Sequence, residues 1–407
     1  MRRPSLSGRQ PSRGVPLPAS CGDALVARML DPAAVAARRE AVSAATHQKR
    51  YDGDSWTSTL LVVGPRALDR IRLPWACVMA VTLVWTVPVM SSGQRGRVNL
   101  EQFVSAYNLV LTTLSFLLVF RMNRAAVRFW DCRQMWGKLI EVGRQLTAGA
   151  ALHCRHAPAA RDALAAWTCA FAVGSKDLLR GNAALDAAQL RGILSAADAA
   201  AASQAAHMPL YCAAAMRAAL AAALGPAGMS PAEAEAPAAV AVATATHRAA
   251  CLRTLDVHVD ELIGQVGGME RIRATPLPLV YVAHLRTFLL CYLLFMPLVY
   301  VGHWQWGTIP AMALVAFALL GVEGAAAECE SPFEQRANHL AMDAYAAALV
   351  ANVAEILTVA EVHAAAPWAQ PYEAQHRELK APPPAPRLSL GAKPLPPHAA
   401  IAVLPPS

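Results

Sequence analysis

The sequence predicts an all-α membrane protein in which four transmembrane helices, arranged as two hairpins, are continuous with a soluble helical layer. Three observations predict this fold class. Of the 407 residues, 56% are hydrophobic and only 16% are charged, whereas an ordinary soluble domain is about 25% charged. Four long stretches carry few or no charges, and no stretch alternates apolar and polar residues as a half-buried β-strand would.

The four predicted membrane spans are residues 73–94, 103–120, 280–302 and 304–322. Each is close to the roughly 20 residues that a helix needs to cross about 30 Å of hydrocarbon. The third span differs because His284 and Arg286 interrupt its first turns, so we expect it to enter lipid late. Arg286 either faces a bundle interior or a water-filled cavity, or extends from the helix end toward the membrane surface.

The basic residues indicate an orientation for the two hairpins. They cluster before the first span, after the second and before the third, at Arg66, Arg70, Arg72, Arg121, Arg124, Arg128, Arg133, Arg271 and Arg273. Because Lys and Arg are enriched on the cytosolic side of membranes, this pattern places both termini and the long middle segment on a cytosolic or stromal face. Arg95 and Arg97, in the first hairpin loop, weaken the signal without reversing it.

The main domain is predicted to cover residues 47–363. Its soluble helical part covers residues 124–270, where apolar residues recur at helical spacing. A flexible insertion is expected at residues 225–238, because Gly and Pro interrupt the periodicity there. Residues 364–407 contain eleven prolines and are predicted to form a disordered tail.

The N-terminal segment, residues 1–46, is predicted to be a disordered leader. It is rich in Arg and Ser and has no acidic residue before Asp23, a composition typical of organelle transit peptides. It lacks the apolar segment of a secretory signal. A plain disordered basic tail is the alternative interpretation.

The chain carries no signature of a catalytic or cofactor site. It has no Gly-rich phosphate loop, no HExxH or GxSxG motif, and no paired His and Cys at metal-binding spacing. The nine cysteines are irregularly spaced, which favours free thiols in a reducing compartment, and the twelve histidines are scattered. We therefore expect neither an enzyme nor a nucleic-acid-binding protein, and no metal or cofactor.

The stretch SFLLVFRMNRAAVRFW, residues 115–130, joins a membrane span to a basic surface. Within and just before it, Thr112, Phe116 and Phe120 are four residues apart and so share one helix face. Taken alone, such a stripe would face lipid or a protein core. The arginines that follow it favour a conduit that collects anions electrostatically and passes them through a narrow apolar ring.

Several blocks of sequence resemble one family. LSFLLVFRMNRAAVRFWDCRQMWGKLIEVGRQL and MERIRATPLPLVYVAHLRTFLLCYLLFMP are similar to stretches around the second and third spans of the bestrophins. GVEGAAAECESPF resembles the acidic block after their last span, and YDGDSW fits the segment before the first. The chain is therefore identified as a member of the bestrophin family, similar to its chloroplast or algal type, over roughly residues 47–360.

The resemblance implies a homopentamer in lipid that conducts small anions through a central pore lined by the second span of each subunit. Matched on the Leu-Ser-Phe motif, the narrow neck falls on Thr112, Phe116 and Phe120. Thr112 replaces an aliphatic residue of the family and should make its ring easier to wet. HMPLYCAAAMRAAL, residues 207–220, resembles a segment with a second constriction, which the match places at Met208.

The arginines that follow the neck in sequence have two possible roles. Arg121, Arg124 and Arg128 would either concentrate anions or pair with the acidic block, and the two roles are compatible for different arginines. The acidic block comprises Glu323, Glu328 and Glu330.

Calcium-gated members of the family carry a dense cluster of carboxylates just after the Pro-Phe motif. This chain has only Glu334 and Asp343 there, together with Arg336. Because a calcium site needs six to eight oxygen ligands, we expect no such site in this segment.

Taken together, the sequence predicts an anion-selective channel for chloride, bicarbonate or both in an organellar membrane, chiefly a chloroplast thylakoid or envelope membrane. The mitochondrial inner membrane and the plasma membrane are alternative locations. The alternative function is a non-conducting membrane scaffold that recruits partners through its soluble layer and Pro-rich tail.

Overall fold

The computed structural model describes residues 25–45, 68–92, 100, 103–228, 235 and 237–364. Every regular element within these ranges is a helix, which confirms the predicted all-α class for the part of the chain that is described. The described residues up to Ala360 belong to one compact unit, and the last described residues, 361–364, fall in a second.

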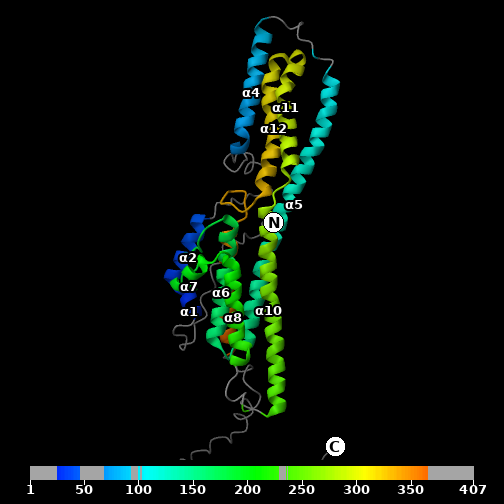
Figure 1. Ribbon diagram of the computed structural model, residues 1–407. Coiled ribbons are helices and arrows are strands. Elements are labelled where there is room, and N and C mark those ends of the chain that lie inside the picture. Colours follow the sequence, from blue (N-terminus) through cyan, green and yellow to red (C-terminus); the bar gives the residue numbers. More distant parts are fainter. Residues whose placement is uncertain are drawn as a thin grey trace, which may run out of the picture. The chain divides into compact units, whose positions relative to one another are not determined.

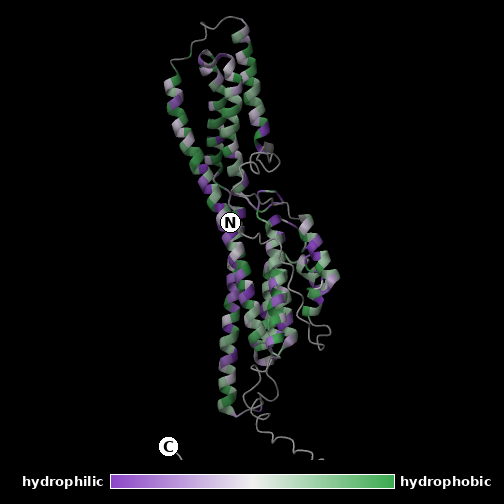
Figure 2. Ribbon diagram, turned by 180° about the vertical axis from the view of Figure 1, so that it is seen from behind, coloured by the Kyte–Doolittle hydropathy of each residue, from purple (hydrophilic) through white to green (hydrophobic). Residues whose placement is uncertain are grey.

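Four helical segments form a largely hydrophobic bundle (Figures 1 and 2). They are α4 (Leu68–Ser91), the first half of α5 (Val104–His153), α11 (Leu279–Trp304) and α12 (Thr308–Glu330). α12 packs against α4 and α5, and α11 packs against α4 and α12. The apolar cluster between them includes Leu114, Leu118, Leu285, Leu289, Met312 and Ala316.

The bundle helices are long and apolar enough to cross a membrane. Among the described residues, the stretches that meet this criterion are 70–91, 104–153, 279–330 and 342–364. The third stretch contains α11 and α12 in succession, so the first three stretches together contain most of each of the four predicted spans. The chain is thus an integral membrane protein.

The turn of the second hairpin differs from the predicted boundary. We expected the fourth span to begin at Trp304, but Trp304 ends α11, and the 3-10 turn η4 (Gln305–Gly307) precedes α12. Gln305 has a φ of 51°, in the left-handed region that non-glycine residues rarely occupy. The chain therefore reverses its direction at this residue.

The second half of α5 continues without a break into the soluble layer. The layer is completed by α6 (Pro158–Arg180), α7 (Ala196–Gln204), α8 (Met208–Leu224), α10 (Ala238–Ala274) and α13 (Met342–Ala364). α6 packs against α8 and α5, and α10 packs against α5 and α8. The predicted continuity between membrane spans and soluble helices is therefore present in a single 50-residue helix.

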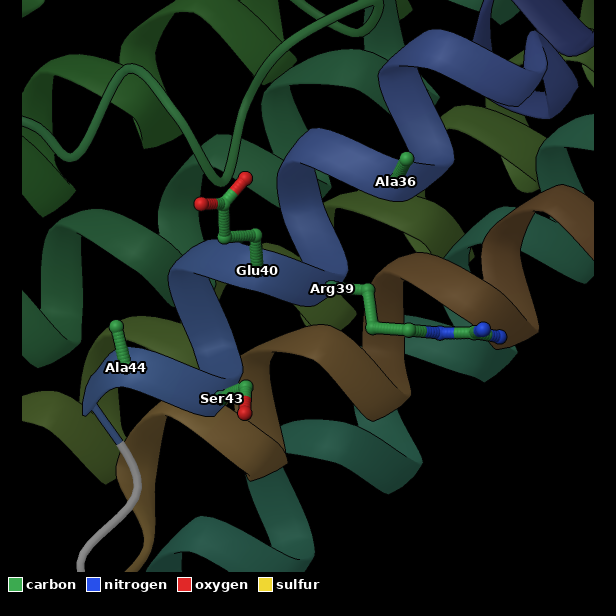
Figure 3. A pocket seen from close by; sticks show the side chains of 5 residues that line it. All are labelled: Ala36, Arg39, Glu40, Ser43 and Ala44. Atoms are coloured by element: carbon green, nitrogen blue, oxygen red, sulfur yellow. The ribbon is translucent and has the colours of Figure 1, made fainter.

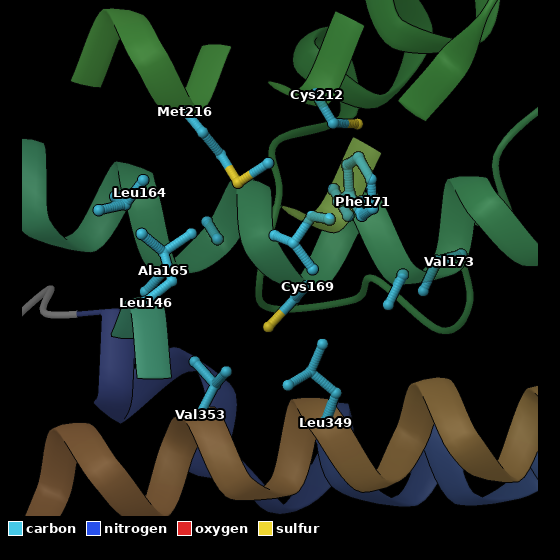
Figure 4. Close-up of a cluster of buried hydrophobic side chains, with 14 of the residues drawn as sticks. Leu146, Leu164, Ala165, Cys169, Phe171, Val173, Cys212, Met216, Leu349 and Val353 are labelled. Atoms are coloured by element: carbon cyan, nitrogen blue, oxygen red, sulfur yellow. The ribbon is translucent and has the colours of Figure 1, made fainter. Parts of the chain in front are cut away.

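A single apolar cluster forms the core of this layer (Figure 4). Leu146 of α5, Phe171 of α6, Met216 of α8 and Leu349 of α13 all belong to it. α5 and α13 approach closely at Gly143, where an added Cβ would lie 3.0 Å from the Leu349 methyl carbons. α13, which sequence analysis did not single out, is apolar because it packs into this core.

The cysteines in the described residues are free thiols, as the sequence predicted. Burial raises the pKa of Cys169 to about 12 and that of Cys212 to about 12. Both therefore stay protonated at physiological pH and act as small apolar groups in the core of the layer.

The predicted disordered leader is wrong for its second half. Residues 25–45 form α1 (Leu25–Leu30) and α2 (Pro32–Ala45). The side chains of α1 that are buried in the core of the layer are Leu25, Val26 and Met29. Arg38 of α2 also donates a hydrogen bond to the carbonyl oxygen of Arg191 at 2.6 Å. Residues 1–24 lie outside the described part of the chain.

The predicted insertion and tail fall mostly outside the described residues. Within residues 225–238, the structure describes Gly225, the 3-10 turn η3 (Pro226–Gly228) and a few residues before α10. Within the tail, it describes only Ala364, which ends α13.

Candidate functional site

One face of α5 carries large apolar side chains that the described part of the chain leaves uncovered. Phe116 is 62% exposed and Phe120 is 44% exposed, and their rings meet edge to face with centroids 4.6 Å apart. Thr112, one turn earlier, is also exposed, and its hydroxyl donates to the carbonyl oxygen of Asn108 at 3.2 Å. Thr112, Phe116 and Phe120 thus lie along one exposed strip, called the α5 stripe below.

The opposite face of α5 is packed against the other bundle helices. Leu114 and Leu118 are buried in the same cluster as Leu285 and Leu289 of α11. Tyr281 of α11 also donates a hydrogen bond to the carbonyl oxygen of Leu117 on α5. Because one face of α5 is fixed by this packing, the α5 stripe faces away from the bundle, toward lipid, another protein surface or a water-filled passage.

Arg121 follows the α5 stripe directly and is completely buried. Its Nε lies 3.2 Å from Oε2 of Glu323, and its Nη2 lies 2.7 Å from Oε2 of Glu330. Arg286 of α11 makes a further ion pair with Glu323 at 2.8 Å. Arg121 is therefore a structural link between α5 and α12, because moving it would remove an ion-pair partner from both Glu323 and Glu330.

Arg128 and Arg124 have different environments. Arg128 donates to the carbonyl oxygens of Ile272 and Thr275 at 2.5 and 2.9 Å, which satisfies groups at the C-terminal end of α10 that have no partner within that helix. Arg124 is exposed and forms no ion pair or hydrogen bond with any described residue. Of the three arginines, only Arg124 is available to a passing anion.

The remaining carboxylate of the acidic block, Glu328, is also paired. Its Oε1 lies 2.6 Å from Nε of Arg70 and 3.1 Å from Nη1 of Arg336. Its Oε2 lies 3.1 Å from Nε2 of His339, which is 1% exposed. The pairing that the sequence offered as an alternative therefore holds for Arg121, whereas Arg128 binds backbone carbonyl oxygens and Arg124 is exposed.

Comparison with known families shows which family the chain belongs to. The profile of the family described as "Bacterial/Fungal Bestrophin protein" matches residues 46–355. The chain belongs to the bestrophin family. The match confirms the resemblance seen in the sequence blocks and includes the α5 stripe and the acidic block, whereas α1 and α2 precede it.

Relatives of this bestrophin carry a channel name. A "Voltage-dependent anion channel-forming protein" of Synechocystis sp. is 26% identical over 318 residues, which cover 76% of this chain and 94% of the relative. A protein with the same description from Mesorhizobium japonicum is 31% identical over 248 residues, which cover 59% of this chain and 71% of the relative.

Solved structures share the fold of this bestrophin. A variant of a bacterial bestrophin homolog from Klebsiella pneumoniae aligns with a TM-score of 0.59 and 19% sequence identity. The alignment covers 70% of this chain and 98% of that chain. At this level of identity, the likeness supports the arrangement of the helices and nothing finer.

The second predicted constriction is contradicted at Met208. This residue begins α8, is 5% exposed, and belongs to the core cluster of the layer. A side chain that lines a passage between subunits must be exposed in the single subunit, so Met208 cannot line one. The exposed apolar side chains of the same helical turn are Leu210 and Tyr211.

The structure brings together three side chains that sequence analysis did not connect. His153 lies in the last turn of α5, and His247 and Cys251 lie one turn apart on α10. We call these three residues the His–Cys cluster. They border a cavity of about 420 Å³. The four-residue spacing of His247 and Cys251 is the only part of this cluster that is visible in the sequence, and the search for paired His and Cys overlooked it.

A second hollow, of about 490 Å³, lies along α2 (Figure 3). Its described lining comes from α2 alone and consists of Ala36, Arg39, Glu40, Ser43 and Ala44. Arg39 and Glu40 point in different directions in Figure 3. We assign no role to this hollow, because no second element contributes a described group to it.

Proposed function

We propose that this bestrophin is one subunit of an anion-selective channel that conducts chloride, bicarbonate or both passively across an organellar membrane. The α5 stripe carries the proposal, because Phe116 and Phe120 are large, apolar and uncovered by the described residues of their own chain. The description of the relatives as anion channel-forming proteins supports the same function.

The channel is proposed to be a homopentamer. Two helical hairpins cannot enclose a pore by themselves, and the packed face of α5 leaves the α5 stripe on the outside of the bundle. Several copies that turn this face toward a common axis would shield it from lipid and line a pore with it. The resemblance to the bestrophins supplies the number of five.

The neck is proposed to consist of three rings contributed by Thr112, Phe116 and Phe120. An ion that passes an apolar ring loses part of its hydration without polar replacement, so the aromatic rings set the main barrier. The Thr112 hydroxyl offers a polar contact and should keep its ring wetter. Such a neck discriminates by ion size and dehydration energy, which chloride and bicarbonate share as small monovalent anions.

Arg124 is proposed to give the pore its preference for anions. It lies four residues beyond Phe120, is exposed, and has no partner within the described residues. Five copies around an axis would produce a positive ring that raises the local anion concentration. The nearby carboxylates Glu323 and Glu330 do not oppose it, because each is paired with Arg121.

Reversal potentials test the proposal directly. Purified protein in planar bilayers under a KCl gradient should reverse near the chloride equilibrium potential. Arg124→Gln should shift the reversal potential toward zero, whereas Arg144→Gln, which changes an exposed arginine farther along α5, should shift it less. Reversal near the potassium potential would contradict anion selectivity, and an impermeable pentamer would favour the scaffold alternative.

The organellar location is proposed from the composition of residues 1–24. Because α1 packs into the core of the layer, cleavage of a transit peptide should occur before Leu25. N-terminal sequencing of the protein from native membranes checks this expectation. An intact Met1 on a protein in the plasma membrane would contradict the organellar location.

A further inference from the structure

The His–Cys cluster has the geometry of a metal site. Sγ of Cys251 lies 3.4 Å from Nδ1 of His153 and 3.5 Å from Nε2 of His247. The three candidate ligand atoms all lie within 4.8 Å of one another. In a tetrahedral zinc site with Zn–S near 2.3 Å and Zn–N near 2.0 Å, sulfur and nitrogen are about 3.5 Å apart. The two sulfur–nitrogen distances therefore already match those of a zinc-bound state.

The fold holds the three ligands in place from two long helices. His247 and Cys251 are four residues apart on α10 and so project from the same face. One turn beyond, the side chain of Leu255 packs directly onto the backbone of α5, where an added Cβ at Gly149 would lie 2.6 Å from Leu255 Cδ2. This close approach of α5 and α10 brings His153 against Cys251.

The chemistry of the ligands selects the type of metal. One thiolate and two imidazoles favour zinc and related soft transition metals over calcium or magnesium, which prefer oxygen ligands. Three protein ligands leave one position of a tetrahedron open. Because His247 is exposed and the cluster borders the cavity of about 420 Å³, a metal has a route of entry.

Two neighbouring groups set limits on the site. Arg248 lines the same cavity, and its Nη2 donates to the carbonyl oxygen of Ala223 at 2.7 Å. Its positive charge favours an anion over a neutral molecule as the fourth ligand. Cys154 is buried next to His153, but its sulfur is not among the three ligand atoms that lie within 4.8 Å of one another.

We propose that His153, His247 and Cys251 bind one zinc ion, or a related thiophilic divalent metal, with the fourth coordination position open to the cavity. The bound metal would tie the last turn of α5 to α10. The site is independent of the proposed neck, because it lies at the opposite end of α5.

Cobalt titration of the full-length pentamer in detergent tests the proposal. After treatment with a chelator, wild-type protein should bind one Co²⁺ per chain with a thiolate-to-cobalt charge-transfer band, and zinc should displace the cobalt. Cys251→Ser should abolish the band. Cys154→Ser is the matched control and should retain it, since it removes a thiol beside His153 that is not a ligand.

A second variant separates loss of the site from loss of the fold. His247 is exposed, so His247→Ala should fold normally and keep the metal-free thermal midpoint of the wild type. It should nevertheless weaken zinc affinity at least about tenfold, as loss of even a supporting group does at metal sites. Zinc should also raise the thermal midpoint of the wild type, because it binds only the folded state, and should not do so for His247→Ala.

Two results would overturn the proposal. The first is a wild-type protein that gives no thiolate-to-cobalt band. The second is a band that survives in Cys251→Ser, which would place the metal on another cysteine.

Discussion

The two halves of α5 differ in the exposure of their apolar side chains. In the membrane half, Leu109, Phe116 and Val119 are 73%, 62% and 66% exposed. In the layer half, Trp136 and Leu146 are completely buried in the apolar cluster that α5 shares with α6, α8, α10 and α13. One continuous helix therefore passes from a surface that the described residues leave open to a core that helices of the same chain complete.

This difference indicates which contacts stabilise each half of α5. The layer half gains from burial within the subunit, so substitutions there should weaken the fold of a single chain. The membrane half completes its burial only against lipid or other subunits, so substitutions on the α5 stripe should change assembly and conduction more than folding. Arg121 lies at the boundary and provides the sharpest test of this division.

The largest effect is expected for Arg121→Ala. The change removes a fully buried charge and leaves Glu323 and Glu330 with fewer partners. Loss of one partner of a buried ion pair costs about 3–5 kcal/mol of unfolding free energy. Thermal unfolding in detergent should show the loss. Arg124→Ala, only three residues away but exposed, should change the free energy of unfolding by less than about 0.5 kcal/mol. Equal losses in the two variants would contradict the structural role of Arg121.

Truncation of aromatic side chains should have different effects in the two halves of α5. Trp136→Ala should cost about 3–5 kcal/mol, because it removes a fully buried ring from the layer core. Phe116→Ala and Phe120→Ala should cost much less, and should instead raise unitary conductance and loosen size selectivity. Single-channel recording and thermal unfolding of the same preparations check this. Unchanged conductance in both phenylalanine variants would place the neck elsewhere.

A smaller effect is expected for Thr112→Ile. The substitution removes the hydroxyl that bonds to Asn108 and adds an apolar ring to the neck. Unitary conductance should fall, because the ring becomes harder to wet. Thr112→Ser keeps the hydroxyl and should remain close to the wild type. If both variants lowered conductance equally, the wetting argument would be wrong.

The smallest effect is a dependence of stability on pH, and it concerns His339, which lies between α12 and α13. His339 accepts a hydrogen bond from the Glu334 N–H at Nδ1 and contacts Glu328 through Nε2. Burial lowers the pKa of His339 below its usual 6.5, and Glu328 offsets only part of this. The unfolded chain therefore takes up the proton first as pH falls. The contribution of His339 to the free energy of unfolding should be constant above about pH 6.5. It should decline as the pH falls below this value, until the lower folded-state pKa is reached.

Thermal midpoints at about pH 7.5 and about pH 5.5 measure this decline. His339→Gln lacks the titrating ring and should show a smaller decline than the wild type. Identical pH dependence in the two proteins would show that His339 does not contribute.

The sequence predicted the fold where the physical signal is local. Long uncharged stretches reveal membrane helices whatever they pack against, so the spans were placed within a few residues. α1 and α2 were missed because the basic, Ser-rich composition before them dominated the interpretation of residues 1–46. The spacing of Leu25, Val26 and Met29 was the available signal for a short amphipathic helix.

The candidate site was predictable only in part, because burial and partner choice depend on distant residues. The four-residue spacing of the α5 stripe can be read in the sequence, but which of its neighbouring arginines is buried cannot. Met208 illustrates the same limit, since a helix start identifies the turn and not the side that faces a passage. His153 is separated from Cys251 by 98 positions, so only the packing of α5 on α10 could join them.

The docking of α1 has a consequence for biosynthesis. The backbone N–H of Leu25 bonds to Asp162, 137 residues later in the chain. At about 5–20 residues per second, a ribosome needs roughly 7–27 s to make that interval. The segments that form the first two membrane spans are made within this interval, during which Leu25, Val26 and Met29 have no complete core to join. Among the described helices, α1 is thus the first to be synthesised, yet it can reach its native position only after the chain has been made as far as α6.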